Sequence, residues 1–165
     1  MATKSDFTPD EWKMILGSPM LAGMAVTLAD PSGLFGLLKE GMASGRALLE
    51  ARSAPGANGL VKELVADMET SEGRATARDA MKAELTGKSP DEIKSQLLSV
   101  LGQVGKILDA KAPQDSAAFK GWLKHVAEQV AEASSEGGFL GFGGVKVSDA
   151  EKASIADVAK ALNLG

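Results

Sequence analysis

The chain of 165 residues contains no cysteine, no tyrosine and a single histidine, His125. Without cysteine it can form no disulfide, thiolate nucleophile, thiolate zinc site or iron–sulfur cluster. The N-terminal residues MATKSDFTPDEW also lack the apolar stretch of a secretory signal. Both features are typical of a cytoplasmic protein, and we therefore expect a cytoplasmic location.

Aromatic residues make up only 4% of the chain, so aliphatic residues must fill most of its interior. Hydrophobic residues make up 44% and charged residues 24%, which is ordinary usage for a globular protein. At this length we expect one domain, residues 1–165, with a core that is stable without disulfides. The net charge of −4 and the lack of any basic run exclude nucleic acid as an expected partner.

Long apolar runs are scarce as well. The strongest candidate lies between Lys13 and Lys39, where Asp30 is the only charged residue. A bilayer span needs about 20 consecutive apolar residues, but GSP and DPSG interrupt this run. We expect a new helix to start at Ser18 and Pro19, and a tight turn at DPSG. The sequence therefore predicts a buried core helix here rather than a membrane span.

Three helix starts carry the same signal. The segments TPDEWK from Thr8, SPDEIK from Ser89 and SDAE from Ser148 each place a hydroxyl residue three positions before a glutamate. This spacing is a capping box, in which the two side chains bond to each other's free backbone N–H groups. The apolar residues between these signals recur with helical spacing, and no stretch alternates as a strand would. We predict an all-α, single-domain bundle of about eight helices, at residues 9–16, 19–29, 33–52, 58–70, 72–86, 90–111, 115–135 and 149–163.

The units that start near Thr8 and Ser89 each lead to a similar patch, FGLLK and FKGWLK. This similarity raises the hypothesis of an internal duplication of one helical unit.

The ends of the chain resemble known sequences. The opening FTPDEWKMILGSPMLAGMAVTLADPSGLFGLLKEG and the ending that includes GFGGVKVSDAEK resemble small, uncharacterised bacterial all-helical proteins. This resemblance implies a bacterial origin and a helical fold, but it implies no particular activity. LAGMAVTLADPSG is also similar in part to TerB-like tellurite-resistance domains, in which an alanine-rich helix ends in Ala-Asp-Gly. Here Pro31 and Ser32 separate Asp30 from the glycine, and the acidic clusters of that family's metal binding are not evident.

A glycine-rich segment, residues 137–144, separates the last two predicted helices. It is not a phosphate-binding loop, because Gly144 stands where that motif has lysine. One interpretation is a packed connector, in which Phe139, Leu140 and Phe142 fold back onto the bundle. The other is an exposed loop, in which the same residues contact a protein partner or a membrane surface.

His125, Glu128 and Glu132 share one face of a predicted helix, and together could supply three ligands to a divalent metal. The alternative is an exposed histidine beside two solvated glutamates. Glu63 and Asp67 also lie one turn apart, and we expect them on a wet helix face, where they would not act as acid or base.

We therefore expect a non-catalytic, soluble helical-bundle protein that binds no cofactor and acts through an unknown protein partner. A stress- or envelope-associated role and a homo-oligomer are compatible with this interpretation. The first alternative is a peripheral membrane or lipid-binding protein that uses the loop 137–144. The second is a divalent-metal-binding protein.

Overall fold

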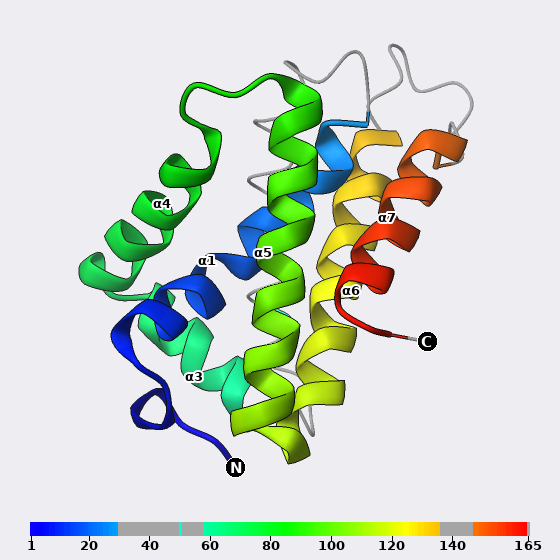
Figure 1. Ribbon diagram of the computed structural model, residues 1–165. Coiled ribbons are helices and arrows are strands. Elements are labelled where there is room, and N and C mark those ends of the chain that lie inside the picture. The colour runs from blue at the N-terminus through cyan, green and yellow to red at the C-terminus, as the bar shows by residue number, and fades with distance from the viewer. Residues whose placement is uncertain (30–49, 51–57, 136–146, 165) are drawn as a thin grey trace.

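The structure, a computed structural model, describes residues 1–29, 50, 58–135 and 147–164 (Figure 1). Over these residues it contains only helices and turns, which confirms the predicted all-α fold. The helices are η1 (Lys4–Asp6, a 3-10 helix), α1 (Pro9–Thr27), α3 (Gly59–Met68), α4 (Ser71–Leu85), α5 (Pro90–Lys111), α6 (Pro113–Ser135) and α7 (Asp149–Ala161). The described residues thus form six α-helices, and the predicted number of about eight is wrong.

The main difference concerns the apolar N-terminal segment. The helices predicted at 9–16 and 19–29 are one continuous helix, α1, with Pro19 inside it. The predicted helix 33–52 lies outside the described residues except for residue 50, and so does the predicted turn at 30–33. The predicted helices 58–70, 72–86, 90–111, 115–135 and 149–163 correspond to α3 to α7 with small shifts at their ends.

Helix α1 continues through Pro19 because a neighbouring side chain replaces the missing hydrogen bond. Proline has no N–H, so the carbonyl of Ile15, four residues earlier, loses its usual donor. The hydroxyl of Ser18 donates to that carbonyl oxygen at 2.7 Å. Both residues are fully buried, so the carbonyl would otherwise have no partner in an apolar environment.

Helix α1 occupies the centre of the fold and contacts every other described α-helix (Figure 1). From Ile15 to Thr27 every residue is buried except Met20 and Met24, which are half-buried. At Gly17 the helix comes close to α4, because a methyl group added there would lie 3.1 Å from the Cβ of Ala80. Among the described helices, α1 included, none is long and apolar enough to cross a membrane.

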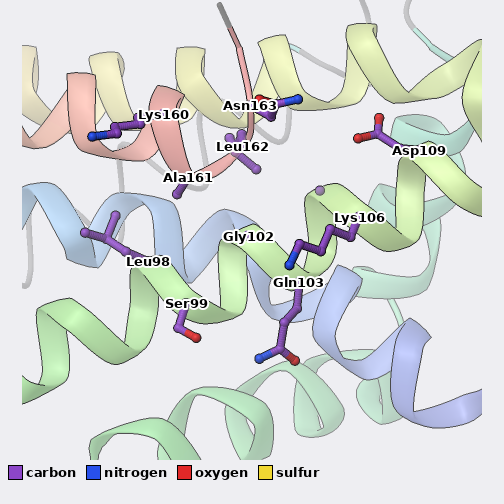
Figure 2. A pocket seen from close by; sticks show the side chains of 11 residues that line it. Leu98, Ser99, Gly102, Gln103, Lys106, Asp109, Lys160, Ala161, Leu162 and Asn163 are labelled. Atoms are coloured by element: carbon purple, nitrogen blue, oxygen red, sulfur yellow. The ribbon is translucent and has the colours of Figure 1, made fainter.

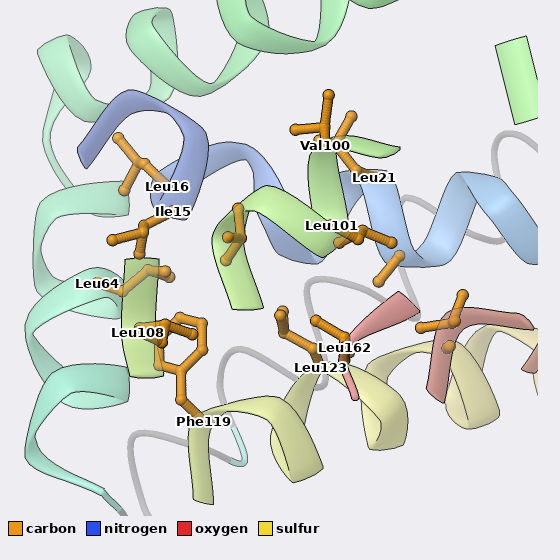
Figure 3. Packing of buried hydrophobic residues seen from close by; sticks show 14 of the residues in the cluster. Ile15, Leu16, Leu21, Leu64, Val100, Leu101, Leu108, Phe119, Leu123 and Leu162 are labelled. Carbon is orange, nitrogen blue, oxygen red and sulfur yellow. The ribbon is translucent and has the colours of Figure 1, made fainter. Parts of the chain in front are cut away.

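A single hydrophobic core surrounds α1. Figure 3 shows part of it, with side chains from α1, α3, α5 and α6 in one cluster. Its largest fully buried side chains are Phe119, Ile15, Leu16, Leu21, Leu60, Leu64, Leu97, Leu101, Leu108, Leu123, Leu162 and Val26. Burial of each leucine or phenylalanine contributes about 1.5–3 kcal/mol, so this cluster is the main source of stability.

The three predicted capping boxes are present. The backbone N–H groups of Thr8, Ser89 and Ser148 donate to the glutamate three residues on, at 2.7, 2.8 and 2.7 Å respectively. These boxes start α1, α5 and α7. The patch FGLLK lies outside the described residues, so the internal duplication stays a prediction.

Candidate functional site

The predicted metal ligands lie on α6. His125 is exposed, and its Nδ1 lies 3.8 Å from Oε2 of Glu128. Each of these residues also has another partner, since Nε2 of His125 lies 3.0 Å from Nε2 of Gln129 and Oε1 of Glu128 pairs with Lys124 at 3.2 Å. Within the described residues no three acidic, histidine or cysteine side chains are gathered as a metal site would require.

Metal binding through His125, Glu128 and Glu132 therefore stays a prediction. Metal analysis of protein purified without a histidine tag tests it, and a metal content well below one ion per chain would exclude it. The predicted contact residues Phe139, Leu140 and Phe142 lie outside the described residues. For them the test is flotation with liposomes, in which a Phe139→Ser/Phe142→Ser double variant should lose any binding that the wild type has.

The structure indicates a different site, a groove of about 680 Å³ between α5 and the C-terminal end of α7 (Figure 2). We call it the α5–α7 groove. It is lined by Leu98, Ser99, Gly102, Gln103, Gly105, Lys106, Asp109, Lys160, Ala161, Leu162 and Asn163.

Two glycines on α5 shape the floor of this groove. A methyl group at Gly102 would lie 3.4 Å from the carbonyl oxygen of Ala161, and one at Gly105 would lie 3.5 Å from that of Leu162. The end of α7 therefore packs against the backbone of α5, and larger side chains at the two positions would push the helices apart. Leu162 is fully buried at this contact and holds the end of α7 in the core.

The rim of the groove carries two exposed lysines, Lys106 on α5 and Lys160 on α7 (Figure 2). Neither forms an ion pair within the described part of the chain. Lys160 lies in the last turn of α7, where a positive charge also offsets the partial negative charge of the helix end.

An ion pair between a buried lysine and an exposed aspartate lies at the end of the groove. Lys120 of α6 is buried, and its Nζ donates to both carboxylate oxygens of Asp109, at 2.6 and 2.7 Å. The hydroxyl of Ser116 donates to the same carboxylate at 2.6 Å. The hydrogen bonds from Lys120 and Ser116 lower the pKa of Asp109, which is therefore ionised at neutral pH. The lysine stem packs beside Gly105, so this pair fixes α6 against the groove floor.

The charges of the groove favour an anionic ligand. The charged residues that line the groove are Lys106, Lys160 and Asp109, and the carboxylate of Asp109 is already paired with Lys120, so the two exposed lysines leave an excess of positive charge. Such a site can pair with carboxylate groups through its two exposed ammonium groups, while the leucine and glycine surface between them accepts apolar contacts.

The sequence interpretation missed this groove. The available signal was the pair Gly102 and Gly105, three residues apart inside a long amphipathic helix, where glycine lowers helix stability. Such a pair indicates close approach of another backbone, but it does not say which element approaches. Asp67 was also misplaced, because the structure shows it half-buried and bonded to Trp12 and Lys4 rather than solvated.

Compared with known proteins, the chain matches no family model, no curated protein and no solved structure.

Proposed function

We propose that this chain is a non-catalytic helical-bundle protein that acts through protein–protein contacts, with the α5–α7 groove as its contact surface. The observation that carries the proposal is the charge of the groove. Two exposed lysines, Lys106 and Lys160, flank it on a chain whose net charge is −4. A partner segment with acidic side chains would be attracted to this surface and oriented on it.

The shape of the groove favours a helical or extended segment of a partner over a compact small molecule. The groove is open and follows the line where α5 and α7 meet (Figure 2). Its floor contains Gly102, Gly105 and Ala161, whose small size lets α5 and α7 pack closely and adds no bulky side chain to the groove. Leu98, which is half-buried, supplies apolar surface beside them.

Two carboxylates outside the groove, Glu11 and Glu92, have a structural role, which is compatible with a contact protein. Glu11 accepts hydrogen bonds from Lys111 and from the backbone N–H of Thr8, and these bonds lower its pKa. Hydrogen bonds from the side chain and backbone of Ser89 lower the pKa of Glu92 in the same way. Carboxylates with lowered pKa are ionised at neutral pH and are poor proton donors, so their role here is to cap and connect helices.

Site-specific photocrosslinking in the native host tests the proposal. A photoreactive residue at Ser99 or Gln103, both exposed on the groove lip, should give a crosslinked product with a defined protein. The matched control places the same residue at Ala75 or Arg78, which are exposed on α4. Equal crosslinking from the groove and the control positions would contradict the proposal. A crosslinked product between two copies of this chain would show that the partner is a second copy and that the protein forms a homo-oligomer.

A stress- or envelope-associated role stays a prediction. Identification of the crosslinked partner by mass spectrometry tests it. A partner that lies in the cell envelope, or whose expression rises under stress, would support this role.

A further inference from the structure

A second cavity lies where η1 and Phe7 meet α1, α3 and α4, and no residue of α7 lines it. Its volume is about 240 Å³. Two aromatic rings form part of its wall, Phe7 and Trp12, whose centroids lie 5.9 Å apart. Two carboxylates, Asp67 of α3 and Glu72 of α4, also line it. A cavity with aromatic rings and carboxylates is the environment that binds organic cations.

The cavity already contains one cation from the chain itself. Lys4, in η1, places its Nζ 2.9 Å from Oδ2 of Asp67 and 6.0 Å from the centre of the Trp12 ring. The same carboxylate oxygen accepts the indole N–H of Trp12 at 2.7 Å. Lys4 therefore occupies the cavity in the way that an alkylammonium ligand would, with an ion pair on one side and an aromatic ring on the other.

The carboxylate of Asp67 is held in its charged form and in a fixed position. Partial burial raises the pKa of Asp67, but hydrogen bonds from Trp12 and Lys4 outweigh that effect, and the pKa lies below its usual value. Trp12 is almost completely buried, so its ring is fixed, and its N–H holds the carboxylate in position. The ring of Trp12 and the carboxylate of Asp67 are thus held in place by the surrounding structure.

The internal cation, in contrast, is exchangeable. The side chain of Lys4 is 52% exposed, while that of Asp67 is 15% exposed. Ion pairs with one exposed, flexible partner contribute little to stability, so an external cation has little to displace. With Lys4 displaced, the cavity would hold two carboxylates, Asp67 and Glu72, and no compensating charge among its lining residues.

We propose that this cavity is a binding site for alkylammonium groups, with Lys4 as its internal occupant. Alkylammonium is the chemistry shared by small amines and by the lysine side chains of a polypeptide. The proposal does not depend on the α5–α7 groove, since the two cavities share no residue.

The indole N–H signal of Trp12 in a ¹H–¹⁵N NMR spectrum reports on this site directly. Titration with butylammonium chloride should shift it, relative to sodium chloride at equal ionic strength and to the neutral analogue butan-1-ol. Trp122, the other tryptophan, lies on α6 outside the cavity, and its signal is the internal control. The variant Lys4→Ala should bind butylammonium about three- to fivefold more tightly than the wild type, because the internal competitor is removed.

The variant Asp67→Asn should lose the response, while its amide oxygen still accepts the indole N–H. The matched control Asp149→Asn removes an exposed carboxylate on α7 and should leave the response unchanged. Tighter binding of the peptide acetyl-Gly-Lys-Gly-amide, whose termini carry no charge, than of butylammonium would identify polypeptide side chains as the source, and the reverse order would identify small amines. No specific shift of the Trp12 signal in either the wild type or Lys4→Ala would overturn the proposal.

Discussion

The hydroxyl of Ser18 donates a hydrogen bond to the carbonyl oxygen of Ile15 at 2.7 Å, inside the fully buried part of α1. This bond replaces the one that Pro19 cannot form. It allows a proline to lie within the central helix without leaving a buried carbonyl unsatisfied. Because α1 contacts every other described α-helix, the integrity of this turn matters for the whole fold.

We expect the variant Ser18→Ala to lower the free energy of unfolding by about 1–3 kcal/mol, since it leaves a buried carbonyl without a donor. In the double variant Ser18→Ala/Pro19→Ala the new N–H at position 19 can bond to Ile15, and most of the loss should be recovered. Urea denaturation measures both effects. Ser95→Ala, an exposed serine in α5, is the control and should change stability by no more than about 0.5 kcal/mol. A double variant no more stable than Ser18→Ala would show that the hydroxyl does not substitute for the proline.

Two glycines should respond to alanine in opposite directions. A methyl group at Gly73, in the first turn of α4, would overlap the carbonyl oxygen of Asp67. Gly73→Ala should therefore destabilise the turn between α3 and α4 by about 1–3 kcal/mol. Gly121, within α6, has open space at the same position, and Gly121→Ala should stabilise the protein by about 0.4–1 kcal/mol. Thermal denaturation of the two variants would contradict the described packing if both moved in the same direction.

Lys120 and Asp109 form an ion pair but are buried to different extents. Replacing one of them should therefore lower the free energy of unfolding more than replacing the other. The side chain of Lys120 is 5% exposed and that of Asp109 is 52% exposed. Asp109→Ala leaves a buried ammonium without a counter-charge, and we expect a loss of about 1–3 kcal/mol. Lys120→Met leaves an exposed carboxylate in water and an apolar side chain in the core, and should cost no more than about 1 kcal/mol. Urea denaturation at neutral pH that gave the reverse order would contradict the burial of Lys120.

The same pair predicts a pH dependence. The pKa of Asp109 is lowered in the folded state, so its stabilising contribution is complete above the unfolded-state pKa of about 3.9 and is lost as pH falls through the folded-state pKa. In the acid range the wild type should lose this contribution, whereas Asp109→Ala has none to lose. The stability difference between the two proteins should therefore be constant from neutral pH to about pH 5 and narrow below about pH 4. Urea denaturation over this range measures it, and a difference that stays constant down to pH 2 would exclude the ion pair as its source.

The helix starts could be predicted because their signals are local. Thr8, Ser89 and Ser148 each meet a glutamate three residues on, and the structure places α1, α5 and α7 at these boxes. The helical spacing of the apolar residues between these boxes also predicts one buried face for each helix, and in α5 Leu97, Leu101 and Leu108 are indeed fully buried.

The errors have a common physical origin in side-chain contacts that spacing does not encode. The pair Ser18 and Pro19 is equally typical of a helix start, and the spacing does not show that the serine hydroxyl can bond to Ile15 and let α1 continue. The spacing of Asp67 predicts a solvated carboxylate. In the structure Trp12 of α1, 55 residues away in sequence, donates a hydrogen bond to it. The α5–α7 groove also depends on long-range packing, since Gly102 marks a close approach without naming α7 as the neighbour.

The central claim is that the lysines of the α5–α7 groove hold an acidic partner protein. The most direct measurement compares crosslinking from Gln103 in two charge-reversed proteins. Lys106→Glu/Lys160→Glu reverses the groove, and Lys62→Glu/Lys82→Glu makes the same change of net charge at exposed lysines on α3 and α4. We predict that the crosslinked product disappears in the first protein and persists at the wild-type level in the second. Retention of the product after reversal of the groove, or its equal loss in both proteins, would contradict the claim.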